Sequence, residues 1–344
     1  MAKLLQIVFL GKDYIYILIV IILSFLIGAV MMVFSGANPL IAYSALLQSA
    51  FGSVHSLSET MAKTCPLLLA GLGTVVAYRC KFWNIGSEGQ IYIGGIVAAL
   101  IGTLPLYVPS VIHILFIFLA SFLGGGLYAL IPGFLKAKFR INEVIVTMML
   151  NYISIHLVSF LLHGPMRDPQ SYLPISKRLQ ETATLPILIP TTRFHLGIVV
   201  ALALAILVHL LIWKSILGFR IRAVGENERA ARVGGINPMT VLLWAALISG
   251  GLSGFAGSLE IIGIQRRLIE GFSPGYGYLA IAVALIGNLK PMGVVFSSVL
   301  FGALLSGANA MQSIANVPAS IIYVIEGLII MAISARLFAR WRLV

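Results

Sequence analysis

The stretch KSILGFRIRAVGENERAARVGGINP, Lys214–Pro238, is a charged segment in a chain that is otherwise almost continuously apolar. Seven of the 34 charged residues lie within these 25 positions. The whole chain has 60% hydrophobic and 10% charged residues, with a mean hydropathy of +1.03. A soluble surface needs charge on about a quarter of its residues. The composition therefore indicates an integral membrane protein, with Lys214–Pro238 as a polar segment between two spans.

Runs of about 20 apolar residues, each long enough to cross the hydrocarbon core as a helix, recur along the chain. We expect an all-α, polytopic protein whose residues 1–344 form a single transmembrane domain with about ten helices. The predicted spans are 14–34, 60–79, 86–104, 110–132, 142–163, 194–213, 240–263, 277–289, 293–311 and 317–335. The eighth and ninth are short and are joined by Lys290-Pro291. Eight or nine full crossings with re-entrant segments are the alternative.

The basic residues flank these spans, so the net charge of +12 points to the membrane surface and not to nucleic acid. With a cytoplasmic N-terminus, sixteen basic residues lie inside and seven outside, which is the expected asymmetry. We therefore expect a multi-pass protein of the cell membrane with both termini cytoplasmic. The loop 164–193 is then external, and either an ordered contact surface or a plain connection fits its composition.

A weak internal repeat has a constant offset of 185 residues. Ile96–Gly102 (IVAALIG) resembles Ile281–Gly287 (IAVALIG), and Gly86 matches Gly271. The pseudo-repeats would cover about 60–163 and 245–336. Five spans in each half is an odd number, so the two halves would have opposite orientations, as in the 5+5 inverted repeats of transporters. Chance similarity between helices rich in Ala, Ile and Gly is the alternative.

The charged segment 214–238 is predicted to contain one short helix of about two turns. Asn227 suits the N-cap because its side chain can accept hydrogen bonds from the first turn. Glu228 and Arg232 have the favourable i,i+4 order. Gly234-Gly235 would end the helix, and Pro238 would prevent its continuation.

So short a helix must pack on something, because its nucleation is costly. The adjacent Ala230 and Ala231 would let another protein approach the helix backbone closely. A solvated connector that lies against lipid headgroups is the alternative.

The motif GENERAARVGGI, Gly225–Ile236, resembles the cytoplasmic coupling segment of ABC-importer permeases, in which an Ala-Ala pair is followed by Gly. The stretches GFRIRAVGEN (218–227) and FWNIGSEGQ (82–90) resemble the permeases for branched-chain amino acids, simple sugars and nucleosides. The likeness covers about residues 14–336 and is closest to nucleoside or simple-sugar permeases. The segment implied to contact the ATPase consists of Glu226, Asn227, Glu228, Arg229, Ala230, Ala231, Arg232, Gly235 and Ile236.

The resemblance also implies partners. They are a second permease subunit, identical or related, a cytoplasmic ABC ATPase and an extracytoplasmic solute-binding protein. The chain has no G-x-x-x-x-G-K-[ST] motif to hold ATP phosphates. We therefore expect no cofactor on this chain, with ATP bound by the partner ATPase, and a role as the permease subunit and not as an enzyme.

Polar residues within predicted spans are candidates for a substrate pathway. Glycines around Glu88 would permit a broken helix that lines a polar cavity. Close helix packing by these glycines, with Glu88 at the inner headgroup level, is the alternative. The candidates for the pathway of a small polar solute are Asn84, Glu88, Gln90, Tyr92, Asn151 and Glu326.

The sequence leaves three other functions as alternatives. An ion-coupled secondary transporter would use Glu88 or Glu326 and would work without ATP. An intramembrane enzyme would need a nucleophile–base pair or a metal site, and the sequence shows no such spacing and no metal motif. A non-transporting membrane scaffold would use the charged segment to recruit a partner and would have no polar pathway.

Overall fold

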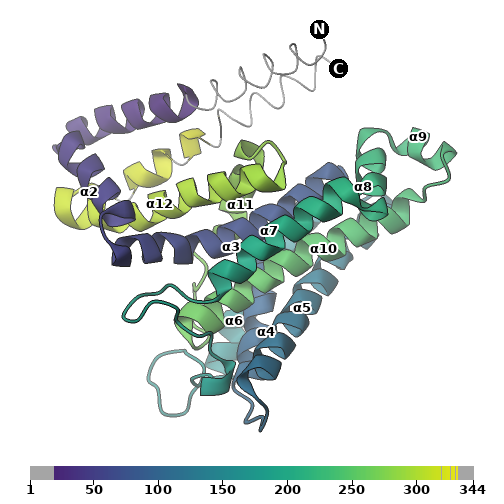
Figure 1. Cartoon of the computed structure of the whole chain (residues 1–344), viewed down its shortest axis with the longest axis horizontal. Helices are drawn as coiled ribbons and strands as arrows, with labels where there is room; N and C mark the ends of the chain where they lie inside the picture. The colour runs from purple at the N-terminus through teal and green to yellow at the C-terminus, as the bar shows by residue number, and fades with distance from the viewer. Residues whose placement is uncertain (1–18, 319, 326, 330, 332–344) are drawn as a thin grey trace. The chain divides into compact units, whose positions relative to one another are not determined.

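The structure is a computed structural model that describes residues 19–318, 320–325, 327–329 and 331. In these ranges the regular structure is helical, with three isolated β-bridges, so the predicted all-α fold is confirmed (Figure 1). The helices are α2 (Pro39–Phe51), α3 (Val54–Arg79), α4 (Ser87–Gly102), α5 (Ser110–Phe139), α6 (Glu143–His163), η1 (Glu181–Ala183), α7 (Gly197–Lys214), α8 (Ile216–Glu226), α9 (Glu228–Val233), α10 (Pro238–Leu259), the π-helical η2 (Glu260–Gln265), α11 (Tyr276–Ile286) and α12 (Pro291–Ala315).

Six of the described helices are long and apolar enough to cross a membrane: α3, α5, α6, α7, α10 with η2, and α12. The segments 19–34, 39–51, 276–286 and 320–329 are shorter apolar helices. The expected span 110–132 ended too early, because α5 continues to Phe139 and ends only at the left-handed Arg140. Lys136 and Lys138 in its last turn do not stop a helix, since basic side chains favour the negative C-terminal end. The helix α2 was not predicted.

The described residues belong to two compact units, 1–60 with 303–344 and 61–302. In the first unit, Leu46 of α2 packs directly on Gly307 of α12. The hydroxyl of Ser49 donates to the carbonyl of Ser306 at 3.3 Å. Glu326, a candidate pathway residue, and both chain termini lie outside the described residues.

Glycines hold the core of the second unit, where α10 packs between α4 and α5. A Cβ atom on Gly94 would lie 1.9 Å from the carbonyl oxygen of Gly254, and one on Gly254 would lie 2.3 Å from that of Ser121. Such small residues let helix backbones touch inside a membrane. The glycines after Glu88 therefore allow close helix packing, which was the alternative to a broken helix, and α4 is continuous.

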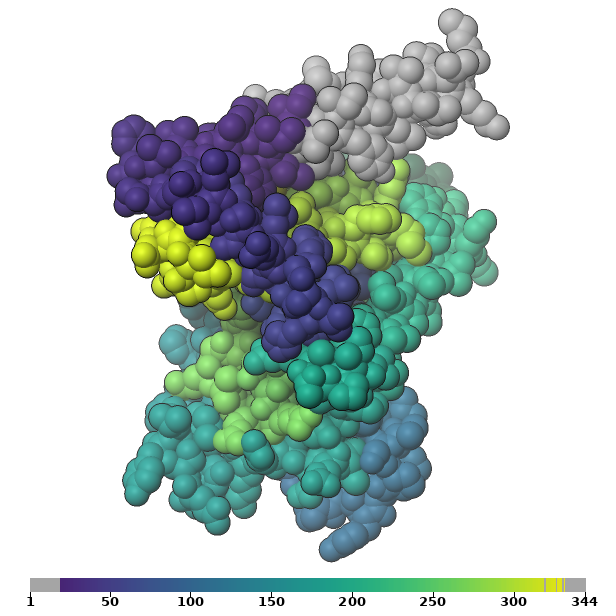
Figure 2. All heavy atoms as spheres, turned by 60° about the vertical axis from the view of Figure 1, so that its left-hand side comes forward, coloured from purple at the N-terminus to yellow at the C-terminus, as the bar shows by residue number. Residues whose placement is uncertain are grey.

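The second unit carries different features at the two ends of α5, a helix of 30 residues that is about 45 Å long. Near its first turn, His113 Nδ1 lies 3.0 Å from Thr182 Oγ1 of the loop 164–193. The amide of Gln180 in the same loop donates to the carbonyl of Gly102 at 2.8 Å. This loop (teal in Figure 2) is therefore ordered against the ends of α4 and α5. The helices α8 and α9 lie at the other end of α5.

Two of the helix bounds are compatible with the offset of 185 residues, while the repeat itself stays a prediction. The offset carries α3 onto 239–264, and α10 with η2 occupies 238–265. It carries Gly102, where α4 ends, onto Gly287, the C-cap of α11. The opposite orientation of the two halves stays a prediction.

The contact of Gly254 gives a test of the packing. Gly254→Ala places a methyl group against the backbone of α5, so the helices must separate at a cost of about 1–3 kcal/mol. Gly234→Ala is the matched control, because its new Cβ would lie no closer than 3.4 Å to Ala231. Thermal unfolding of the detergent-solubilised protein should show a lower Tm for the first variant alone. Equal Tm values for the two variants would contradict the packing.

Candidate functional site

The charged segment 214–238 forms two helices, α8 and α9, and not the one short helix that was predicted. Ser215 caps α8, and its side chain accepts the amide hydrogen of Gly218 at 3.0 Å. The buried face of α8 packs closely, because a Cβ on Gly225 would lie 1.9 Å from the carbonyl oxygen of Arg79 at the end of α3. This tertiary contact stabilises α8 and leaves no clear signal in the local sequence.

The capping of α9 agrees with the prediction. The side-chain oxygen of Asn227 accepts from the amides of Arg229 and Ala230, both at 3.0 Å. Glu228 and Arg232 form the expected i,i+4 ion pair at 3.3 Å. The helix therefore begins and is held as its sequence indicates.

One detail of this segment was predicted wrongly. Ala231 is buried, so only Ala230 of the alanine pair is exposed. The helix α9 contacts α8 and α10, and Ala231 is on its buried face. The end of α9 agrees with the prediction, because Gly234 is its C-cap and Pro238 begins the next helix, α10, after the N-cap Asn237. Val233, which was not predicted as a site residue, is 91% exposed at the end of α9.

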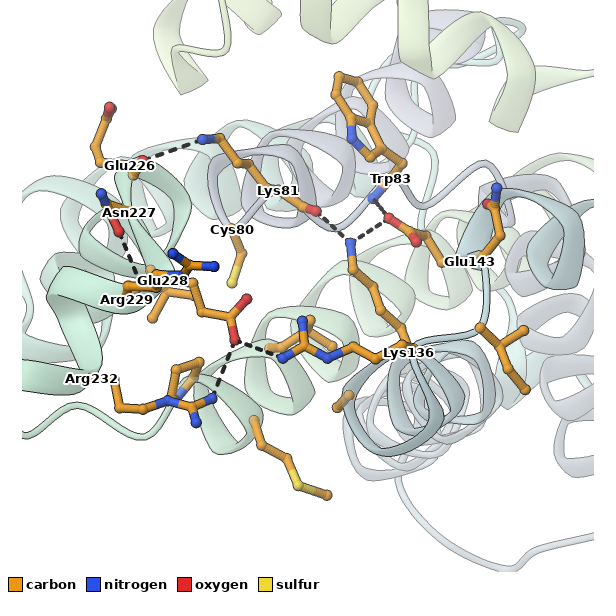
Figure 3. A pocket seen from close by; sticks show the side chains of 18 of the residues that line it. Cys80, Lys81, Trp83, Lys136, Glu143, Glu226, Asn227, Glu228, Arg229 and Arg232 are labelled. Carbon is orange, nitrogen blue, oxygen red and sulfur yellow. Dashed lines mark hydrogen bonds and ion pairs between the residues drawn. The ribbon is translucent and has the colours of Figure 1, made fainter.

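A cavity of about 780 Å³ lies beside α9 (Figure 3). Its walls come from α9 and the end of α8, the turn between α5 and α6, and the segment after α3. The lining charged residues are Lys81, Lys136, Arg140, Glu143, Glu226, Glu228, Arg229 and Arg232. Those of α8 and α9 were expected to be site residues, and those of the other walls were not.

Two bridges join α9 and the end of α8 to these other walls. Glu228 Oε1 accepts from Arg140 Nη2 at 3.3 Å, as it does from Arg232. Lys81 Nζ donates to the backbone carbonyl of Glu226 at 3.3 Å. The residues of these two pairs are 88 and 145 positions apart in the sequence, so no local pattern predicts them.

A more buried ion pair lies deeper in the same region. Lys136 of α5 pairs with Glu143 of α6, and Lys136 also donates to the carbonyl of Lys81 at 2.6 Å. Glu143 accepts the amide hydrogen of Trp83 at 3.1 Å. Glu143 thus does more than favour the start of α6, because it also holds the segment that leads into α4.

The predicted pathway residues near the start of α4 are buried and bonded to the protein. Asn84 and Gln90 exchange two side-chain hydrogen bonds of 3.0 and 3.1 Å, and Asn84 also donates to Ser249 of α10 at 3.0 Å. Asn151 of α6 accepts from the amide of Gly89 at 2.8 Å and donates to the carbonyl of Ile85 at 3.0 Å. These side chains tie α4 to α6 and α10.

The two remaining described candidates face α11 and the loop before it. Glu88 accepts the amide hydrogen of Gly277 at 2.7 Å, so the first turns of α4 and α11 meet at this carboxylate. The hydroxyl of Tyr92 lies 3.5 Å from the carbonyl of Ser273. The structure therefore brings Asn84, Glu88, Gln90, Tyr92 and Asn151 into one buried polar region. Their contact with a solute stays a prediction.

Residues 56–334 match the family described as "Branched-chain amino acid transport system / permease component". The chain is 36% identical to the guanosine ABC transporter permease protein NupP of Bacillus subtilis, over 92% of each chain. It is 32% identical to the glucose ABC transporter permease protein TsgB13 of Haloferax volcanii, over 92% of this chain and 86% of the relative. It is 30% identical to the nucleoside ABC transporter permease protein NupB of Lactococcus lactis, over 93% and 90%.

The relatives include pairs of permeases. Bacillus subtilis has a second guanosine permease protein, NupQ, which is 26% identical to this chain over 71% of the chain and 78% of the relative. No solved structure matches the chain.

The pair Lys136–Glu143 predicts a strong asymmetry between two charge deletions. Lys136→Met leaves the carboxylate of Glu143 buried without its cation. The free energy of unfolding should fall by an amount toward the lower end of about 3–5 kcal/mol. Arg140→Met breaks the exposed bridge to Glu228 and should cost less than about 1 kcal/mol.

The measurement is the free energy of unfolding of both variants in detergent. The double variant Lys136→Met/Glu143→Met should recover more than half of the loss, because the unpaired carboxylate is gone. A loss at Lys136→Met no larger than that at Arg140→Met would show that the pair is not important for stability.

Proposed function

Since the chain belongs to the family of permease components of the branched-chain amino acid transport system, we propose that it imports nucleosides, or else simple sugars, as the permease subunit of an ATP-driven transporter. Its likeness to the guanosine, nucleoside and glucose permeases supports these two classes of solute. The proposal includes a second permease subunit, and the pair of guanosine permeases NupP and NupQ supports it. A cytoplasmic ATPase that binds ATP and an extracytoplasmic solute-binding protein complete the proposed assembly.

The exposed end of α9 is the surface that we propose contacts the ATPase. Val233 is almost fully exposed, and Ala230 is exposed beside it. Arg229 and Arg232 surround this small apolar surface and can reach acidic groups of a partner. The cap by Asn227 and the bridge at Glu228 hold the helix in place before any partner binds, which lowers the cost of ordering it.

The distribution of basic residues indicates which side of the membrane α9 faces. The end of the second unit that carries α9 also carries Lys81, Lys136, Lys138, Arg140, Arg220 and Arg222. Basic residues near span ends favour the cytoplasmic side. We therefore place α9 in the cytoplasm, the ordered loop 164–193 outside, and both termini inside.

The buried polar region at the start of α4 is proposed as the place where the solute is bound or passed. Amide and hydroxyl groups suit a sugar or a nucleoside, which offers many hydroxyl groups. In the described structure these groups bond one another, so an open pathway requires that they exchange these partners for the solute. The ion-coupled alternative gains no support, because relatives over most of the chain are ABC transporter permeases.

A charge at the end of α9 tests the docking proposal. In the complex co-expressed with its ATPase, Val233→Glu should lower co-purification of the ATPase at least about tenfold, as the loss of a central interface contact does. Substrate-stimulated ATP hydrolysis should fall with it. Val233 is a better position than Ala231, because a charge at the buried Ala231 would disturb the packing of α9 itself.

Leu173→Glu is the matched control. Leu173 is also an exposed apolar residue, at 65%, but lies in the loop 164–193 at the other end of the unit. This variant should retain the ATPase. Normal ATPase recovery with Val233→Glu, in a complex that is otherwise intact, would refute the assignment of α9.

A further inference from the structure

Two arginines flank one tryptophan at the junction of α7 and α8. The guanidinium carbons of Arg79 and Arg222 lie 5.2 and 4.9 Å from the ring centre of Trp213, so they are at most about 10 Å apart. Arg79 is satisfied, because its Nε and Nη2 donate to the carbonyl of Leu289 at 3.1 and 3.0 Å. Two like charges at this distance repel each other. The pair therefore favours a nearby anion.

Arg222 has an unsatisfied donor in the described structure. Its Nε atom is buried and has no hydrogen-bond partner among the described residues, and the same residues offer it no ion pair. A buried donor without a partner is costly. Glu226, one turn further along α8, acts electrostatically on Arg79, but it is exposed and forms no ion pair with Arg222 among the described residues.

The exposed face of α8 combines apolar and basic side chains. Ile216 is 73% exposed and Phe219 is 57% exposed, and the exposed Arg220 is on the other side of Ile216 from Phe219. At 100° per residue these three side chains fall within one arc of 100°, with Arg222 next to Phe219. A helix with this pattern is typical of the membrane interface, where the apolar side chains enter the acyl region.

The position of α8 fits the same interface. It begins two residues after the end of α7, which is a membrane span, and a Cβ on Gly218 would lie 2.0 Å from the carbonyl of Leu211 in that span. The helix is thus held against the end of a span. Between Lys214 and Gly225 the sequence has three basic residues and no acidic residue. This charge is complementary to an anionic lipid headgroup.

We propose that the end of α7 and the exposed face of α8 bind an anionic phospholipid. Arg222 donates to the phosphate group, and Phe219 and Ile216 beside it contact the acyl chains. Arg220, on the other side of Ile216, and Lys214 add to the positive charge of this face. The two exposed apolar side chains favour a lipid over a free phosphate ion, which has no apolar part. The site goes beyond the transport function and does not depend on the identity of the solute.

The test measures lipid retained by the full chain purified in a mild detergent. The protein is incubated with phosphatidylglycerol or phosphatidylcholine, and the bound lipid is counted by native mass spectrometry. Arg222→Gln should lower phosphatidylglycerol binding about fivefold, the factor expected when one basic side chain leaves an anionic lipid surface. Phosphatidylcholine binding should not change. Arg229→Gln, with the same charge change on α9, should leave both unchanged.

Further variants and controls distinguish a bound lipid from a free phosphate ion and from a second copy of the chain. If Arg222→Gln does not fold, the double variant Lys214→Gln/Arg220→Gln takes its place. It removes two exposed charges and should also weaken phosphatidylglycerol binding. Phe219→Ser should weaken binding, and inorganic phosphate should not displace the lipid. Displacement by inorganic phosphate, or equal losses at Arg222→Gln and Arg229→Gln, would overturn the proposal. So would a wild-type dimer that binds no phosphatidylglycerol and dissociates with Phe219→Ser, since a second copy of the chain would then cover this face.

Discussion

The direct contact of α10 with α4 and α5 through glycine is the constraint on which the second unit depends. Inside a bilayer the lipid tails are as apolar as leucine, so helices associate through close contact and hydrogen bonds. Gly94 and Gly254 bring two backbones together where any side chain would collide. Because α10 begins just after α9, and α4 begins just after the segment 80–86, this packing also fixes the two regions with functional proposals.

The same close approach explains why the polar side chains at the start of α4 can be buried. Asn84 reaches Ser249 only because α10 lies against α4, and Asn151 reaches the backbone of Gly89 only because that residue has no side chain. Glu88 lies where the positive ends of two helices meet, which favours a carboxylate without a neighbouring cation. The side chains of Asn84, Glu88, Gln90 and Asn151 therefore all have partners, as an interior without water requires, whereas the buried hydroxyl of Ser87 has none among the described residues.

Local features of the sequence predicted local structure well. The apolar runs gave the long spans, and Asn227 was recognised as a cap because capping involves only the next three residues. The packing of α8 on the end of α3 joins Gly225 to Arg79, which are too far apart for any short window of the sequence to contain both. The bridge from Arg140 to Glu228 joins residues 88 positions apart, so only the folded chain reveals it. The roles of the polar residues in transport stay predictions for the same reason.

The contacts of α9 differ in strength, and this difference indicates how its movement would reach the membrane. The bridges from Arg140 to Glu228 and from Lys81 to Glu226 are exposed, and such contacts contribute little. By contrast, Lys136 and Glu143 join α5, α6 and the segment before α4 through a largely buried pair. On the other side, Gly225 packs α8 directly on the end of α3. If α9 contacts the ATPase as proposed, a force on it would pass mainly through α8 into α3 and α7, while the exposed contacts of Arg140 and Lys81 could break and reform. An anionic lipid bound to α8 would act on the element that transmits this force.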